Sequence, residues 1–387
     1  MSPRTRFLVL AVSTPVLAFA VIGGYLGTVM AREESYQHLR VFEDVISLIM
    51  NNYVEDPELD KVMEGAMRGL AEGLDPDSAY LTPAEVKAMQ LGAKQPDAGV
   101  GVELTRQYYL RIIAVRDDSP AAKAGLASGD YIRAIDGRPT RDMSVIEGMR
   151  LLRGAPGSKV SLVVIRGSAA EPHPVDLQRA APSGPEVSSR MIGTQVGYVR
   201  VAAFSAGTVE QLRTRIADLT KSGATRLAID LRRTAEGPLD SGTAAARLFV
   251  SSGTLSVKEG RNTPKETITA TKGDGAVTLP VVLLVGGGTS GAAEVFAAAL
   301  AGNDRAELVG EHTVGRAAVQ RLTPLPDGSG IWMTRVRYLT PSGAPLHLKG
   351  LEPSLTVEEP DVEFGAAPSD KDPILDAAIE RLNSKKA

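Results

Sequence analysis

The sequence predicts an α+β protein of several domains, in which an apolar N-terminal segment and a helical region precede two regions that mix strands with helices. The chain has 387 residues, enough for two or three domains with buried cores. Short β-like runs separated by glycine turns fill residues 97–180. From residue 196 onward strands and helices alternate, which favours a mostly parallel sheet covered by helices.

The first 31 residues read as a membrane or export signal. Arg4 and Arg6 precede an apolar run, Phe7–Ala31, and about 25 residues can span a bilayer. The positive flank predicts a cytoplasmic N-terminus, so the body would be anchored in an inner membrane and face the periplasm. In the alternative, a cleaved signal peptide ending at VMA (29–31) would release the body into the periplasm.

The composition excludes several classes of function. The net charge is −3 and no basic block occurs, so we expect no nucleic-acid partner. With four histidines, no cysteine and no metal-ligand spacing, the sequence predicts neither a metal site nor a cofactor. No disulfide supports the fold, since there is no cysteine.

Residues 32–92 are predicted to be helical, because Leu39, Phe42, Ile46 and Ile49 recur at helical spacing. The stretch LDPDSAYLTPAEV (74–86) adds a turn and a new helix, with Thr82 as its N-cap and proline at its first position.

Residues 97–180 contain GVGVEL (99–104), YLRIIAVRDDSPAAKAGLASGDYIRAIDG (109–137), a predicted helix near 144–152 and the strand SKVSLVVIR (158–166). Ser119 is predicted to cap the helix that follows it. The SPAxxAGLxxGDxIxxIDG core resembles a PDZ domain. The resemblance implies binding of an extended peptide as an added strand, with its terminal carboxylate held by backbone N–H groups. The carboxylate-binding loop then falls on Gly99, Val100, Gly101 and Val102. The alternative is a PDZ domain that packs on its neighbour and binds nothing.

The last large region predicts strands at 196–204 and 226–232 and helices at 208–221 and 241–249, with a loop or hairpin near 258–275 and a short final helix at 373–382. Its most informative stretch is VVLLVGGGTSGAAEVFAAAL (281–300), an apolar strand and a glycine turn that open onto a helix. Such a turn can present a side chain, or the free N–H groups of the helix, to a substrate.

With EHTVGRAAVQ (311–320), LDPDSAYL (74–81) and the TPSG turn (340–343), this region resembles the C-terminal processing (tail-specific) peptidases, which are serine–lysine proteases. The resemblance implies a crotonase/ClpP-like α/β core, and Asp77 stands where the family usually has histidine. It divides the chain into an anchor (1–31), a helical region (32–96), a PDZ domain (97–180), a peptidase-like core (181–360) and a tail with a short helix (361–387).

The residues that the family uses for catalysis are substituted in this chain. The family's nucleophilic serine falls on Gly291 and its general-base lysine on Arg316, while Gln320 matches the glutamine that supports the lysine. Arginine does not lose its proton in proteins. In the family's NNPGG element, which helps to form the oxyanion hole, the first glycine falls on Glu236 and the second on Gly237. A pair between Glu236 and Arg316 is a hypothesis from charge alone.

Catalysis by another route would use Ser290 as nucleophile and His312 as base, oriented by Asp230 or Glu294. Against it, Ser290 and its neighbour Thr289 are more naturally N-caps of the helix. The glycine run lacks the Gly-Lys-Ser/Thr ending of a phosphate loop.

The sequence therefore predicts an extracytoplasmic C-terminal processing peptidase homologue that binds protein C-terminal tails and has lost hydrolysis. It would act as an adaptor, as a regulatory partner of an active paralogue, or as a homo-oligomer. An active serine-type endopeptidase using Ser290 and a purely structural scaffold are the alternatives.

Overall fold

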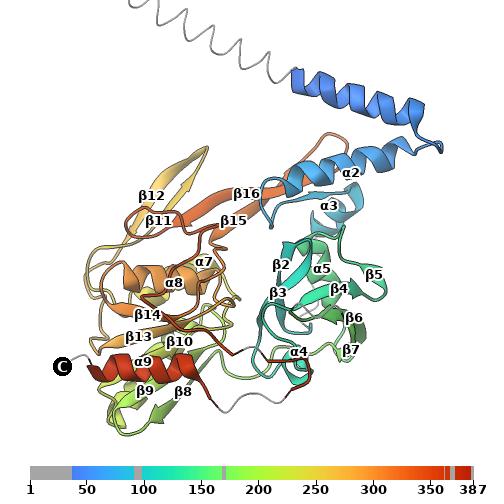
Figure 1. Ribbon diagram of the computed structural model, residues 1–387. Coiled ribbons are helices and arrows are strands. Elements are labelled where there is room, and N and C mark those ends of the chain that lie inside the picture. The colour runs from blue at the N-terminus through green and yellow to red at the C-terminus, as the bar shows by residue number, and fades with distance from the viewer. Residues whose placement is uncertain (1–36, 91–97, 168–170, 361, 367–370, 385–387) are drawn as a thin grey trace, which may run out of the picture. The chain divides into compact units, whose positions relative to one another are not determined.

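The computed structural model describes residues 37–90, 98–167, 171–360, 362–366 and 371–384 (Figure 1). Two compact units divide the chain, Met1–Gly69 and Leu70–Ala387. The predicted membrane segment, residues 1–31, lies outside the described residues. Among the helices that are described, none is both long enough and apolar enough to cross a membrane.

Helices dominate the N-terminal part, as predicted, with one interruption. Residues 37–52 are helical, followed by α2 (Leu59–Glu72), the short strand β1 (Ala79–Leu81) and α3 (Pro83–Gln90). The predicted cap of α3 is confirmed, because the Thr82 amide donates to Glu85 Oε2 at 2.9 Å and the Glu85 amide reaches Thr82 Oγ1 at 3.4 Å. The strand β1 was not predicted. It pairs antiparallel with β16, about 250 residues away, and local sequence carries no signal for such a partner.

The PDZ region forms a six-stranded sheet in the order β2-β3-β4-β6-β7, with β5 beside β4. Its elements are β2 (Val102–Gln107), β3 (Tyr109–Val115), α4 (Pro120–Lys123), β4 (Tyr131–Ile135), β5 (Arg138–Pro139), α5 (Val145–Leu152), β6 (Lys159–Ile165) and β7 (His173–Gln178). The predicted cap is confirmed, because Ser119 Oγ accepts from the Ala122 amide at 3.1 Å.

The central sheet of the core has the order β17-β14-β13-β10-β9-β8. Its strands are parallel except for the antiparallel pair β8–β9, so the mostly parallel sheet is confirmed. These strands are β8 (Val187–Ile192), β9 (Val196–Val201), β10 (Arg226–Asp230), β13 (Val281–Val285), β14 (Ala306–Gly310) and β17 (Leu355–Thr356).

Alternate residues of these strands enter two hydrophobic clusters. Leu227 and Ile229 of β10 join the cluster that contains α6 (Thr208–Lys221), α7 (Leu239–Ala246) and α8 (Ala292–Ala301). Ala228 joins the cluster that contains α9 (Pro373–Ser384). Because successive side chains of a strand point to opposite faces, α6–α8 cover one face of the sheet and α9 covers the other. Figure 1 shows α7 and α8 on one side and α9 on the other. The helix predicted at 241–249 is α7, which begins two residues earlier and ends three residues earlier than predicted.

A second, antiparallel sheet of the core has the order β1-β16-β11-β12, with β15 also paired to β16. Its core strands are β11 (Thr254–Gly260), β12 (Thr263–Thr269), β15 (Ala318–Pro324) and β16 (Gly330–Leu339). Strands β11 and β12 form a hairpin, which confirms one of the two forms predicted for residues 258–275.

Candidate functional site

The turn between β13 and α8 ends at Gly291, the N-cap of α8. Gly291 has φ 63° and ψ −119°, a conformation that glycine adopts without strain and most other residues avoid. A Cβ atom built on Gly291 would meet Ala235 O and Leu239 Cδ2 at 3.7 Å, an ordinary contact distance. The turn therefore has room for a side chain at position 291, although the backbone conformation favours glycine.

A buried carboxylate, Glu294, ties this turn to the segment that carries Arg316. Its two oxygens accept hydrogen bonds from the Gly291 amide (3.0 Å), the Thr313 hydroxyl (2.5 Å), the Gly315 amide (2.5 Å) and the Arg316 amide (2.8 Å). Burial raises the pKa of Glu294, and the four donors act in the opposite direction. The carboxylate is occupied by this framework, so the predicted alternative in which Glu294 orients a histidine is wrong.

The Arg316 guanidinium is held by two carboxylates. Its Nε lies 2.9 Å from Asp77 Oδ1, and its Nη1 lies 3.5 Å from Glu103 Oε2. Burial opposes the charge, but the two carboxylates outweigh it and raise the pKa of Arg316 above its usual value. Arg316 thus stays protonated and cannot accept a proton from a nucleophile.

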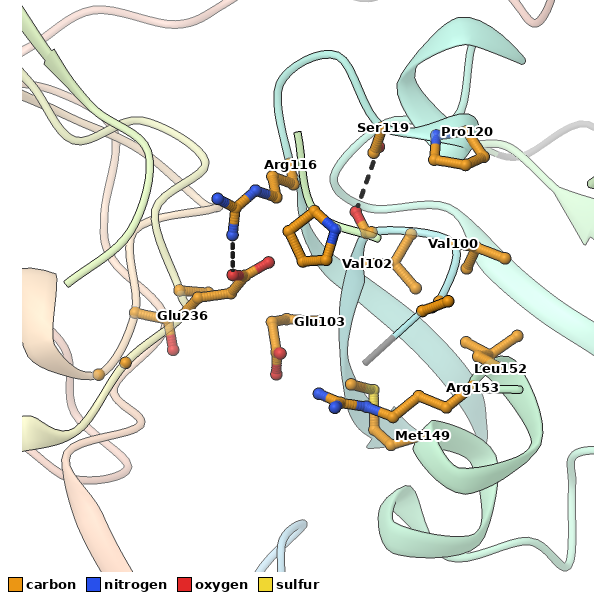
Figure 2. Close-up of a pocket in the computed structure, with 18 of the residues that line it drawn as sticks. Val100, Val102, Glu103, Arg116, Ser119, Pro120, Met149, Leu152, Arg153 and Glu236 are labelled. Carbon is orange, nitrogen blue, oxygen red and sulfur yellow. Dashed lines mark hydrogen bonds and ion pairs between the residues drawn. The ribbon is translucent and has the colours of Figure 1, made fainter. Parts of the chain in front are cut away.

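The predicted pair between Glu236 and Arg316 is wrong. Glu236 forms an ion pair with Arg116, which follows β3 of the PDZ region (Figure 2). Charge alone could not choose between two arginines. A usable signal was present at Asp77, where the resembled family usually has histidine, because a carboxylate at that position matches an arginine at position 316.

The residues of the alternative catalytic route are not assembled. Ser290 is 1% exposed and its Oγ has no hydrogen-bond partner among the described residues. His312 lies near Glu352, with Nε2 to Oε1 at 3.5 Å. Asp230 accepts from Tyr198 and Arg232. Burial raises its pKa, but the hydrogen bonds and charge of Arg232 prevail and lower it to about 2.

One further expectation needs correction. The predicted N-cap hydroxyls do not cap α8: Thr289 Oγ1 donates to Leu231 O at 2.9 Å, and the cap position is Gly291. Thr289 Oγ1 accepts from the Gly286 amide at 3.0 Å, so it serves the turn before the helix and not the helix amides. Gln320, the retained glutamine, donates from Nε2 to Thr334 Oγ1 at 3.2 Å.

One cavity of about 420 Å³ joins the PDZ region to the position of Gly291. On the PDZ side its wall includes the loop 99–102, and Met149 and Leu152 of α5 (Figure 2). On the core side it includes Ser290 and Gly291. Arg316, Glu236, Gly237 and Gln320 also line it. A groove for a peptide and the turn at Gly291 therefore share one space.

Some of the backbone N–H groups of the loop 99–102 are already hydrogen-bonded within the protein, and others are available to a ligand. The Gly99 amide donates to Ala180 O at 3.0 Å, so it is occupied. Within the described residues the amides of Val100 and Gly101 have no acceptor. Gly101 has φ 80°, and a Cβ there would lie 2.2 Å from Ser119 Cβ, so the loop conformation requires glycine.

No group of three or more histidine, aspartate or glutamate side chains that could hold a metal ion occurs in the described part of the chain. The charged side chains near Gly291 are instead joined in the arginine–carboxylate pairs described above.

Comparison with known proteins agrees with this architecture. Residues 111–166 match the PDZ domain family and residues 195–357 match peptidase family S41, which defines the class as a PDZ-containing protein with a peptidase core. The chain is 30% identical over 334 residues to the carboxy-terminal-processing protease of Bartonella bacilliformis, covering 85% of this chain and 77% of the relative.

It is also 32% identical over 344 residues to the carboxyl-terminal-processing protease of Synechocystis sp., covering 87% and 80% of the two chains. The solved structure of a photosystem II D1 C-terminal processing protease is similar to it with a TM-score of 0.68 and 26% identity, covering 82% of this chain and 92% of that one. The chain belongs to the C-terminal processing protease family, as its motifs predicted.

Proposed function

We propose that this protein binds the C-terminal tails of other proteins and does not hydrolyse them, because Gly291 and Arg316 occupy the expected nucleophile and base positions. The observation that carries the proposal is the state of Arg316, which is paired with Asp77 and Glu103 and stands where the family's base is expected. Gly291, at the expected nucleophile position, has no side chain at all. Without a nucleophile no group can attack the peptide carbonyl, and without a base no group can take up the proton of a nucleophile.

Tail binding is supported by the groove in the PDZ region. The amides of Val100 and Gly101 are available to a terminal carboxylate, and Met149 and Leu152 offer an apolar wall to the last side chain. Figure 2 shows the Arg153 side chain reaching into the same cavity, where its positive charge favours a carboxylate.

The location and the assembly are part of the proposal. An anchor at residues 1–31 would hold the body on the periplasmic side of an inner membrane, and cleavage of that segment would release it into the periplasm. In either place the protein would act as an adaptor, as a regulatory partner of an active paralogue, or as a homo-oligomer.

The test measures cleavage and binding on the same peptide. The purified protein and its Ser290→Ala variant are incubated with a fluorescent, unstructured peptide that ends in an apolar residue. We expect no cleavage by either protein, and binding that is lost when the C-terminus is amidated. Gly101→Ala should abolish binding, because its Cβ cannot fit against Ser119.

Other outcomes have a definite meaning. Turnover that Ser290→Ala removes would overturn the proposal and establish the serine endopeptidase. Equal binding of the free and the amidated peptide, or none of either, would leave the scaffold as the correct alternative.

A further inference from the structure

The C-terminal segment contributes one aromatic side chain to the hydrophobic cluster of the PDZ region. The buried members of that cluster lie between residues 100 and 177, yet Phe364 packs against them. The Phe364 ring stacks on His173 with a centroid separation of 4.4 Å and an interplanar angle of 4°. The Arg166 guanidinium carbon lies 5.0 Å from the centre of the same ring.

The slot that receives Phe364 is held in shape by a buried carboxylate. Arg166 forms two hydrogen bonds of 2.7 Å to Asp130, which is 1% exposed, and a third of 2.7 Å to Gly125 O. A bidentate pair of this kind fixes the plane of the guanidinium. Arg166 also approaches the carbonyl of Val362 at 3.4 Å, so it contacts both the ring and the backbone of the segment.

The same part of the chain is fastened to the core on both sides of Phe364. Arg232, which follows β10, bonds Glu359 at 3.0 Å and Asp372 at 2.7 and 2.8 Å. Arg232 is itself 7% exposed and paired with Asp230. One core arginine thus holds the chain before and after the point at which it touches the PDZ region.

We infer that residues 362–366 act as a strap that fixes the PDZ region on the core. The slot is occupied by this segment of the same chain, because Phe364 packs against Arg166 and His173. On either side of it, Glu359 and Asp372 are bonded to Arg232 of the core. One wall of the cavity belongs to the PDZ region and the other to the core, so the strap sets the width of that cavity. Ion pairs also join the two regions, at Arg116–Glu236 and Arg316–Glu103, and the strap adds an apolar contact to them; domains move relative to one another unless their interface is large and apolar. This inference does not depend on whether a ligand is cleaved or bound.

The experiment measures the distance between the PDZ region and the core in the full chain. The chain has no cysteine, so spin labels can be placed at Lys123→Cys and Thr214→Cys, both at exposed positions. Double electron–electron resonance then gives the distance distribution. Phe364→Ala is the test variant, and Glu363→Ala is the matched control, since its exposed side chain has no contact in the slot. Arg166 is left unchanged because its loss would leave the buried Asp130 carboxylate without a cation.

We expect Phe364→Ala to broaden the distribution, on the order of a doubling of its width, and Glu363→Ala to leave it unchanged. An unaltered width in Phe364→Ala overturns the strap, as does equal broadening in Glu363→Ala. If circular dichroism shows that Phe364→Ala disturbs folding of the PDZ region, Phe364→Leu decides. It keeps apolar volume and removes the ring, so wild-type width in that variant also overturns the inference.

Discussion

Removing the Arg316 side chain should destabilise the protein far more than its partial exposure suggests. Arg316→Ala leaves Asp77, which is 6% exposed, without a cation, and Glu103 loses the same partner. Deleting one member of a buried ion pair typically costs about 3–5 kcal/mol, because the remaining charge is buried and unpaired. Since a quarter of the Arg316 side chain (25%) is exposed, we expect the lower end, about 3 kcal/mol.

The reverse deletion should cost less. Asp77→Ala leaves Arg316 with Glu103 and with access to water, so we expect about 1–2 kcal/mol. The double variant should be less destabilised than the sum of the two single variants, by at least about 1 kcal/mol. Arg316→Lys is the control that keeps the charge but loses the planar fork, and it should fall between wild type and Arg316→Ala.

Urea unfolding of the wild type and the four variants, followed by circular dichroism, gives these free energies of unfolding. The m-value must stay constant for the comparison to hold. Additive single-variant losses would show that Asp77 and Arg316 do not stabilise each other. An Arg316→Ala loss below about 1 kcal/mol, the level of a surface pair, would refute the reasoning from burial.

Three further predictions use four substitutions. Burial lowers the pKa of His347. The neutral imidazole therefore stabilises the fold fully above the unfolded pKa of about 6.5, and this stabilisation is lost as pH falls toward the folded pKa. His347→Leu should flatten the dependence of the unfolding free energy on pH between pH 7 and 5, and curves parallel to wild type would contradict this. Leu348 is exposed with φ 62°, so Leu348→Gly should raise stability by about 0.5–1 kcal/mol, seen as a higher Tm. Gly237→Ala would place Cβ 1.7 Å from Phe204 O, so it should lower the free energy of unfolding by more than about 3 kcal/mol. Gly291→Ala places its Cβ 3.7 Å from the nearest atoms, so it should lower that free energy by only about 1–2 kcal/mol. Equal losses by thermal denaturation would refute that contrast.

Patterns that repeat along the chain predicted the fold well. The apolar run 281–285 and the alternation of strand and helix gave the parallel sheet, since both depend on neighbours in sequence. Helix α6 has the bounds that its pattern predicted, Thr208–Lys221. The caps at Thr82 and Ser119 are equally local.

What sequence could not supply were pairings across long separations. The partner of Arg316 lies 239 residues away at Asp77, and the partner of Glu236 lies 120 residues away at Arg116. Ion pairs impose no periodicity on a sequence. The alternation of strands and helices also gave no hint that Phe364, in a polar tail, would pack on the PDZ region.

Two of the substitutions that the resemblance predicts near Gly291, Asp77 and Arg316, pair with each other in the folded protein. Asp77, where histidine is usual, holds Arg316, where lysine is expected, and Glu236, where glycine is expected, holds Arg116. An arginine introduced alone at position 316 would carry an uncompensated charge into a largely buried place, and so would an aspartate introduced alone at position 77. Each member of the pair offsets the cost of burying the other, and reversal to a neutral lysine base would leave Asp77 buried without a cation.

Substituting Arg316→Lys and Gly291→Ser together should therefore restore the residue types of the family's pair without restoring cleavage. Asp77 would keep the new lysine protonated, because a nearby carboxylate stabilises the charged form. If that double variant cleaves the peptide of the binding test, the carboxylates around position 316 do not control its protonation. If cleavage appears only when Asp77→His is added, the ion pair is the element that keeps this site from hydrolysis.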